Sequence, residues 1–429
     1  MKKCLIFLLF IGYLLSGCNV TRTEETTLTP EKTESFFSTS EPTSSVQVVP
    51  TSVPFGHQNE TQSANQYTIH CMDVSNIPLS KLSLSGTLII GYPTTLGEKF
   101  HIDFMSGEKS PFFNGNVYGA NEFFLSPNGE WIAYVRWDSQ DNHSLVIRSV
   151  NGGKTYTYPW GFSEWQAIVT LSYWLNNEKL VVWNHSGVID NVILFDAFTG
   201  NKTVMETKFP DIISSNDFWD SAWPSVTIFD PSLEYLVYLS NNDGKYELGN
   251  QRMVLWDLKR SKRITEVNKF GYTFVWPIWK SDSSGVVYVK SIEGYNPPEN
   301  KDEWFFLGKG GKVKQLTDLS SYFHNSRIFS YSLSPDEKFL AFVLQVDKEG
   351  ERWENKLLIL NMITLEIRDY CFSPEQLAPL VWSIDSNNLA FSRRLNDKTS
   401  DTVVIDLFAQ KAFFIAGNSQ PLVWFNSIK

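Results

Sequence analysis

Short runs of β-branched and aromatic residues recur along most of this chain, separated by clusters of Gly, Asn, Asp, Ser and Pro. Runs of this length and composition are typical of β-strands, and the clusters between them are typical of turns. No helical stripe interrupts the pattern between Ser80 and Lys429, so the sequence predicts an all-β fold. One phrase returns in related forms: "FFLSPNGEWIAYVRW" from Phe123, "IFDPSLEYLVYLS" from Ile228, "IWKSDSSGVVYVK" from Ile278, "YSLSPDEKFLAFVLQ" from Tyr331 and "LVWSIDSNNLAFSR" from Leu380.

The phrase repeats about every 50 residues. Each copy has room for four strands: one before a polar turn, one after it, a third after a variable loop, and a fourth after a tight turn such as "NGGK" from Asn151. Four antiparallel strands repeated in this way predict one propeller blade for each copy. The apolar triplet after each polar turn marks seven copies, at residues 88–90, 132–134, 180–182, 236–238, 286–288, 340–342 and 389–391.

The two ends of the repeat region complement each other. The first copy, from Leu82, has no clear first strand, whereas the stretch "QPLVWFN" from Gln420 resembles a first strand with no copy after it. We therefore expect the C-terminal strand to complete the first blade and close the ring, because closure leaves no open sheet edge. A linear solenoid is the alternative, although its terminal edges would need caps.

The stretches "SLSPDEKFLAF" and "FLSPNGEWIAY" resemble the Ser-Pro-Asp-Gly repeats of TolB-type, WD-repeat-like β-propellers. The resemblance covers roughly residues 80–425, and the Asp of the repeat is kept at Asp336 and replaced by Asn128 in the second copy. It implies a single seven-bladed propeller of four-stranded antiparallel blades in residues 67–429.

The chain begins with "MKKCLIFLLFIGYLLSGC", in which two lysines precede an apolar run that is too short for an ordinary membrane span. Its end resembles the lipobox of bacterial lipoproteins, which implies that residues 1–17 are a signal peptide and that Cys18 carries lipid. Two or three acyl chains would anchor the protein durably to a bacterial membrane, on the extracytoplasmic side. An ordinary signal peptide with a chance cysteine is the alternative.

Residues 18–66 are dominated by Thr, Ser, Glu and Pro. Such a segment has too little apolar surface to offset the entropy of ordering, so we predict a disordered tether between the lipid and the propeller.

The net charge of the chain and its lack of catalytic motifs argue against nucleic-acid binding and against several classes of enzyme. The chain carries a net charge of −10 and has no Lys/Arg run longer than two residues, so nucleic acid is not expected as a partner. It contains no Gly-x-Ser-x-Gly, His-Glu-x-x-His, Walker or Gly-x-Gly-x-x-Gly pattern, and its six histidines are scattered. We therefore expect no catalytic residue, no metal site and no cofactor.

Aromatic loops supply a candidate binding face. In a propeller, the loops between blades and the loops joining second to third strands share one face, and aromatic residues with polar neighbours suit contacts with protein, peptide or glycan. The alternative is that these tryptophans pack between blades as core. The candidates on this face are Trp137, Trp160, Trp165, Trp219, Trp223 and Tyr295.

The leading hypothesis is therefore a membrane-anchored extracytoplasmic binding or scaffold protein, expected to be a monomer, that presents a propeller face to a protein, peptide or glycan. One alternative is a propeller-type enzyme that acts on extracellular glycans through a carboxylate pair in the central channel. Another is a purely structural envelope protein. The predicted innermost strands are mostly apolar or hydroxylic, which weighs against the enzyme.

Two further cysteines, Cys71 and Cys371, are candidates for a disulfide because thiols of exported chains tend to be oxidised. Cys71 lies in a strand-like stretch before the first blade, and Cys371 lies on the outer strand of the sixth. A leading strand along the rim could cover such an outer edge and bring the two together. Two separately buried thiols are the alternative.

Overall fold

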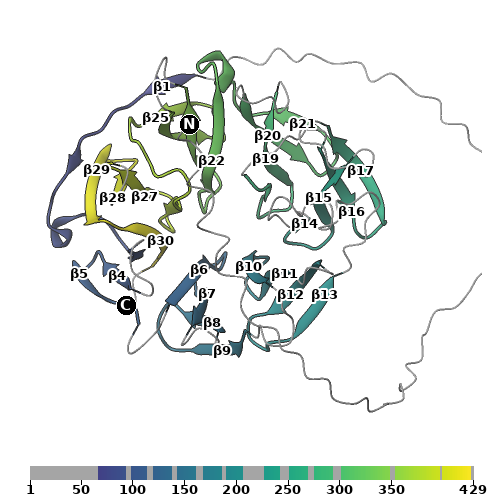
Figure 1. The fold of residues 1–429 in the computed structure, drawn as a ribbon, viewed down its shortest axis with the longest axis horizontal. Coiled ribbons are helices and arrows are strands. Elements are labelled where there is room, and N and C mark those ends of the chain that lie inside the picture. The colour runs from purple at the N-terminus through teal and green to yellow at the C-terminus, as the bar shows by residue number, and fades with distance from the viewer. Residues whose placement is uncertain are drawn as a thin grey trace, which may run out of the picture. The chain divides into compact units, whose positions relative to one another are not determined.

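Seven β-sheets follow one another around a ring in the computed structural model (Figure 1). Each sheet contains four antiparallel strands, so the prediction of a seven-bladed propeller is confirmed. The predicted signal peptide, with Cys18, and nearly all of the predicted tether lie outside the described residues. The structure describes residues 66–92, 98–113, 119–137, 143–160, 168–185, 190–205, 227–241, 251–268, 275–292, 301–347, 353–396 and 399–426.

Blades two to five each use four strands that are consecutive in the sequence. Blade two has β6 (Gly119–Leu125), β7 (Trp131–Trp137), β8 (His143–Ser149) and β9 (Thr155–Pro159); blade three has β10 (Ile168–Trp174), β11 (Lys179–His185), β12 (Asp190–Asp196) and β13 (Lys202–Met205). Blade four has β14 (Thr227–Phe229), β15 (Tyr235–Asn241), β16 (Gln251–Asp257) and β17 (Lys262–Val267); blade five has β18 (Ile278–Trp279), β19 (Gly285–Ser291), β20 (Asp302–Gly308) and β21 (Val313–Gln315).

Blades six, seven and one follow the same plan, with the innermost strand first. Blade six has β22 (Ser326–Leu333), β23 (Phe339–Val346), β24 (Glu354–Asn361) and β25 (Ile367–Asp369); blade seven has β26 (Val381–Trp382), β27 (Asn388–Arg394), β28 (Ser400–Asp406) and β29 (Lys411–Gly417). Blade one combines β30 (Gln420–Phe425) with β3 (Thr87–Gly91), β4 (Lys99–Asp103) and β5 (Glu108–Pro111). Two short 3₁₀ helices, η1 (Leu79–Lys81) and η3 (Leu319–Ser321), connect strands, and no helix among the described residues could span a bilayer.

The C-terminal strand closes the ring as predicted. β30 pairs antiparallel with β3, with Leu88 opposite Trp424. The indole of Trp424 is buried, and its Nε1 donates a hydrogen bond to the carbonyl of Ser85 at 2.9 Å. Because β30 covers the inner edge of β3, the first and last repeats leave no open edge on the axis.

The segment before the first blade adds outer strands to two blades. β1 (Tyr67–Ile69) pairs parallel with β25 of blade six, and β2 (Val74–Ser75) pairs parallel with β29 of blade seven. Between them Cys71 forms a disulfide with Cys371, with the two Cα atoms 4.9 Å apart. The structure therefore has the predicted pairing, and blades six and seven each have a fifth strand that satisfies the outer-edge backbone groups.

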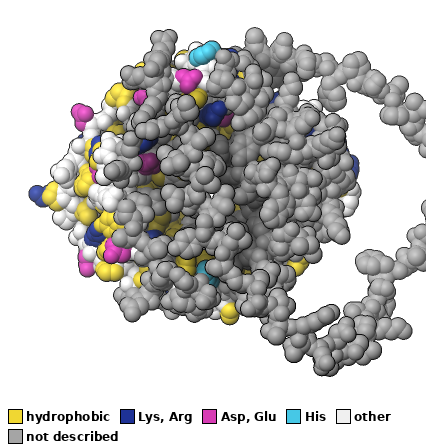
Figure 2. Space-filling view, viewed as in Figure 1, with side chains coloured by type: hydrophobic (Ala, Val, Ile, Leu, Met, Phe, Trp, Pro, Cys, Tyr) yellow, Lys and Arg dark blue, Asp and Glu magenta, His cyan; other side chains and the backbone are white. Residues whose placement is uncertain are grey.

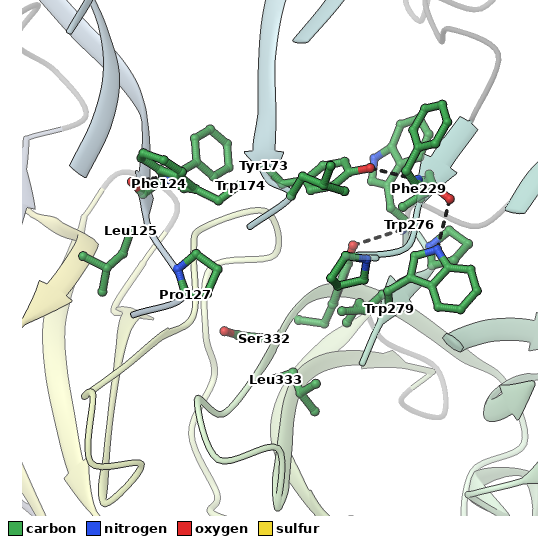
Figure 3. A pocket seen from close by; sticks show the side chains of 16 residues that line it. Phe124, Leu125, Pro127, Tyr173, Trp174, Phe229, Trp276, Trp279, Ser332 and Leu333 are labelled. Atoms are coloured by element: carbon green, nitrogen blue, oxygen red, sulfur yellow. Dashed lines mark hydrogen bonds between the residues drawn. The ribbon is translucent and has the colours of Figure 1, made fainter. Parts of the chain in front are cut away.

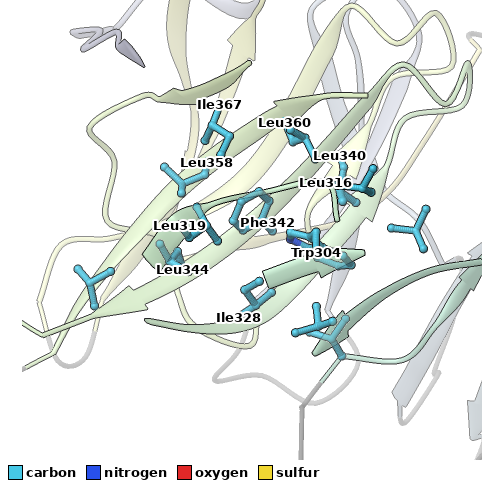
Figure 4. Packing of buried hydrophobic residues seen from close by; sticks show 14 residues of the cluster. Trp304, Leu316, Leu319, Ile328, Leu340, Phe342, Leu344, Leu358, Leu360 and Ile367 are labelled. Atoms are coloured by element: carbon cyan, nitrogen blue, oxygen red, sulfur yellow. The ribbon is translucent and has the colours of Figure 1, made fainter. Parts of the chain in front are cut away.

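Apolar cores lie between neighbouring blades. Figure 4 shows the cluster between blades five and six, where Leu340, Phe342 and Leu344 of β23 pack with Trp304 of β20 and with Ile328. Alternate residues of β23 belong to two different cores, since Ala341 and Val343 pack in the neighbouring cluster. The strand is therefore buried on both faces, which accounts for its continuous apolar run. On the left of the view in Figure 2, over β1–β5 and β26–β30, basic and acidic side chains are interspersed with hydrophobic ones.

The repeated Ser-Pro phrase forms the turn between the first and second strands. Ser334 is buried, and its hydroxyl accepts a hydrogen bond from the N–H of Phe339 at 3.0 Å and donates to Asp336 at 2.7 Å. Ser126 and Ser383 make the same pair of bonds in blades two and seven. The buried hydroxyl thus satisfies a backbone N–H that has no carbonyl partner within the turn. This requirement explains why the phrase recurs.

Candidate functional site

A cavity of about 710 Å³ lies at the centre of the ring (Figure 3). Five innermost strands line it: β6, β10, β14, β18 and β22. It is called the axial cavity below. Its lining residues are Phe124, Leu125, Pro127, Tyr173, Trp174, Leu175, Ile228, Phe229, Pro231, Trp276, Pro277, Ile278, Trp279, Tyr331, Ser332 and Leu333.

The axial cavity lies toward one end of the ring. Most of its lining residues occupy the ends of the innermost strands, and Pro127 and Pro231 belong to the turns that follow β6 and β14. These turns, together with those between third and fourth strands, form one face of the propeller, called the turn face below. The candidate face that the sequence suggests is the opposite one, formed by the longer loops.

Side-chain hydrogen bonds hold the walls of the axial cavity in place. The indole Nε1 of Trp174 donates to the carbonyl of Phe124 at 3.0 Å, across the interface between blades two and three. Trp279 donates in the same way to Ile228, from blade five to blade four. These bonds fix the indole edges against neighbouring strands, so the rings are rigid parts of the wall.

Two tyrosines supply polar atoms to the axial cavity. The hydroxyl of Tyr173 accepts a hydrogen bond from the N–H of Phe229 at 3.0 Å, and that of Tyr331 accepts one from Trp276 at 3.1 Å. Burial raises the pKa of both phenols, so both are neutral at physiological pH. Each hydroxyl accepts one hydrogen bond and could donate another to a ligand.

The lining contains no Asp, Glu, His, Lys or Arg among the described residues. Its polar side-chain atoms are the hydroxyls of two tyrosines and Ser332 and the indole N–H groups of the tryptophans, and the remaining surface is aromatic, aliphatic or proline. A concave apolar site with a few fixed polar groups is typical of sites that hold an apolar or aromatic group by burial. Among the described residues, the ionisable side chains of this lining are the phenols of Tyr173 and Tyr331.

The structure corrects the expected position of Trp160. Its side chain is 6% exposed and packs with Leu145, Ile147 and Phe195 in the core between blades two and three. It therefore follows the alternative interpretation, in which a loop tryptophan packs between blades. Trp137 ends β7 and stacks on His143, with ring centroids 5.6 Å apart. Trp165, Trp219, Trp223 and Tyr295 lie outside the described residues.

A second, polar cavity of about 180 Å³ lies between blades one and two. His101 Nε2 and Ser110 Oγ lie 2.5 Å apart there, and burial, followed by the charge of Arg148, lowers the pKa of His101. The nearby carboxylate of Asp103 accepts hydrogen bonds from Met105 and Ser106 of its own turn. A Ser–His pair without a carboxylate that orients the imidazole is not a hydrolytic triad, so this cavity is the weaker candidate.

The sequence did not single out the axial residues as a site. Tyr173 and Tyr331 belong to predicted innermost strands, which were described as mostly apolar or hydroxylic. One available signal was the aromatic content of these strands. A propeller has no further layer between its innermost strands and the axis, so aromatic side chains that face the axis have no core to pack against. The polar cavity gave no signal, since His101 and Arg148 come from different blades.

Comparison with known proteins supports the fold. No protein-family model matches the chain, and no curated protein does. Similar solved structures include TolB from Acinetobacter baumannii (TM-score 0.43, 13% identity, 85% of this chain and 97% of that chain). Others are an oligogalacturonate lyase from Vibrio parahaemolyticus (0.47, 11%, 78% and 86%) and a prolyl endopeptidase (0.50, 9%, 80% and 51%). Identities this low show the fold alone.

Proposed function

We propose that this protein is an extracytoplasmic binding or scaffold protein, anchored to a bacterial membrane through lipid on Cys18. Its propeller binds a protein, peptide or glycan partner, and the axial cavity receives an apolar or aromatic group of that partner. A protein or peptide is favoured over a glycan, because the lining is dominated by apolar carbon and has no charged or amide side chain among the described residues.

The observation that carries this proposal is the chemistry of the axial cavity. Burial of one aromatic side chain against Trp174, Trp279 and Phe229 would contribute on the order of 2–3 kcal/mol, which is enough for a hot spot but not for tight binding by itself. Further contacts at the rim are therefore part of the proposal. The alternative of a glycan-degrading enzyme receives no support from this lining.

Partner capture with paired variants tests the proposal. The mature chain would be used to capture partners from an extracytoplasmic extract, with Leu333→Arg as the cavity variant and Leu377→Arg as the matched control. Leu377 is exposed on a connection outside the cavity, so both variants add the same charge. We expect Leu333→Arg to lose a partner that wild type and Leu377→Arg both retain. Equal capture by all three chains would refute a role for the cavity.

The lipid anchor has its own test. Cys18→Ser should release the protein from the membrane fraction or leave it unprocessed. A Cys18→Ser chain that fractionates with membranes like the wild type, after normal processing, would remove the anchor from the account without affecting the cavity.

A further inference from the structure

The turns between third and fourth strands share one geometry in five blades. Each begins with Asp or Asn, whose Oδ1 accepts backbone N–H groups two or three residues ahead. Asn361 accepts from Ile363 and Thr364 at 2.9 and 3.0 Å, and Asp406 accepts from Phe408 and Ala409 at 3.0 and 2.8 Å. The bonds hold the residue two positions after the Asp or Asn at the tip of the turn.

Three of these tip residues are large, apolar and exposed. Met105 of blade one, Ile363 of blade six and Phe408 of blade seven are 72%, 71% and 75% exposed. They are called the apolar tips below. The equivalent residue in blade four is Lys259, and in blade three it is Phe198, which packs against Trp131 with centroids 4.9 Å apart.

The apolar tips lie on consecutive blades, because β30 and β3 place blade one next to blade seven. Since they occupy the same position of equivalent turns, they project from the same face of the ring. Isolated exposed hydrophobic residues are ordinary, but these three stand at equivalent positions of adjacent blades and therefore on one side of one face. A flat apolar surface meets three such points together, whereas a pocket in a partner would receive one.

The chain enters the propeller at this same face. β1 runs parallel to β25, the strand that follows the turn carrying Ile363. The N–H of Ile367 in β25 donates a hydrogen bond to the carbonyl of Gln66 at 2.9 Å. Gln66 therefore lies at the start of β25, next to the turn that carries Ile363. The tether of the proposed lipid anchor would thus join the propeller at the turn face.

From these observations we infer that the turn face docks on the lipid bilayer surface by inserting Met105, Ile363 and Phe408 into its apolar interface. Acidic residues accompany the basic ones near these tips, as Glu108 precedes Lys109 and Asp406 precedes Lys411. Attraction to anionic lipid is therefore not the driving force. Docking would present the opposite loop face away from the membrane and would turn the end of the ring that holds the axial cavity toward the bilayer, so a soluble partner would enter the cavity only in the undocked state. The choice of a bilayer rests on the proposed anchor, but the insertion does not require lipid on the protein.

Vesicle flotation tests this inference with an unlipidated chain. A chain of residues 18–429 with Cys18→Ser would be floated with phosphatidylcholine vesicles and with vesicles that also contain phosphatidylglycerol. We expect similar binding to both, with little effect of salt. The variant Met105→Ser/Ile363→Ser/Phe408→Ser should have a vesicle partition coefficient at least about ten-fold lower, because it lacks the apolar area that the parent chain inserts. All three positions are exposed turn tips, so the fold should be unaffected.

The matched control is Leu377→Ser/Leu395→Ser, which removes two exposed leucines from connections at the other ends of the strands. It should bind vesicles like the parent chain. Three results would overturn the inference: no flotation of the parent chain, an equal loss in the control, or binding that requires phosphatidylglycerol and is abolished by salt. None of these results bears on the comparison of partner capture between wild type and Leu333→Arg. The membrane fractionation of Cys18→Ser is likewise an independent test.

Discussion

The indole Nε1 of Trp382 in blade seven donates a hydrogen bond to the carbonyl of Ser332 in blade six, at 2.9 Å. Trp174 and Trp279 make the same bond between blades two and three and between blades four and five. Tyr173 and Tyr331 join the two interfaces that lie between these. From blade two to blade seven, each pair of neighbouring innermost strands is therefore linked by a side chain to backbone hydrogen bond.

Removal of this link should measurably weaken the ring. Trp382→Phe keeps an aromatic ring but leaves the Ser332 carbonyl without its indole donor, which should cost about 1–3 kcal/mol beyond the loss of ring size. Trp160→Phe is the matched control, because the buried Nε1 of Trp160 has no hydrogen-bond partner among the described residues. Urea unfolding of both variants measures the difference. Equal losses would show that the Trp382 hydrogen bond contributes nothing.

Ring closure can be tested at Gly86, which precedes β3. Its φ is +88°, and a Cβ there would lie 2.5 Å from the carbonyl oxygen of Phe425 in β30. Gly152 has a similar φ of +71°, but a Cβ there would meet nothing within 4 Å. Gly152→Ala should therefore cost only the backbone strain, about 1–2 kcal/mol. Gly86→Ala should cost several kcal/mol because backbone must also move. Similar thermal unfolding midpoints for the two would contradict the closure between β30 and β3.

A buried carboxylate makes stability depend on pH. Asp302 at the start of β20 is buried and accepts a hydrogen bond from the N–H of Ile328 at 3.1 Å. Burial raises its pKa to about 7. The folded state therefore holds this proton more tightly than the unfolded state, so the contribution is complete at acidic pH and is lost as pH rises toward 7.

Asp302→Asn should reduce this dependence, because the amide retains an oxygen acceptor and carries no charge. The wild type should lose on the order of 2–4 kcal/mol of unfolding free energy between about pH 5 and pH 8 through this group, and the variant should lose less. Asp73→Asn, at an exposed position, is the control. Parallel stability–pH curves for the wild type and both variants would exclude Asp302 as the source.

The disulfide between Cys71 and Cys371 fastens the leading segment to the outer edge of blade six. Both cysteines are exposed, so a reductant can reach them. Reduction should loosen β1 and β2 and lower stability by about 2–4 kcal/mol. Hydrogen exchange of residues 66–75 measures the loosening. The Cys71→Ser/Cys371→Ser variant should behave like the reduced wild type and should not respond to reductant; unchanged exchange on reduction would mean that backbone pairing alone holds the segment.

The fold could be predicted because its determinants are local and repeated. The Ser334 turn, the apolar triplet and the tight second turn recur in similar form, so one copy explains the others. The unpaired strand from Gln420 and the incomplete copy from Leu82 then implied closure. The disulfide could be predicted because Cys71 and Cys371 were the two cysteines left outside the proposed signal peptide and lipidation site.

The site could not be predicted in the same way. The axial cavity depends on which face of each innermost strand is turned to the axis, and a strand of two residues such as β18 carries no alternation from which to infer this. Trp160 was misplaced because a residue just after a strand can point either into a loop or between blades. The apolar tips became visible only when exposure distinguished Phe408 from Phe198.

Binding of an apolar probe to the axial cavity tests the central claim most directly. The neutral probe N-phenyl-1-naphthylamine, titrated into a chain of residues 18–429, should bind at one site and receive energy from the nearby Trp174, Trp276 and Trp279. Binding should be lost in Leu333→Arg, with its folded state checked by thermal unfolding, and retained in Leu377→Arg. A wild-type chain that does not bind the probe, or a Leu333→Arg chain that binds it as well as wild type does, would contradict the account.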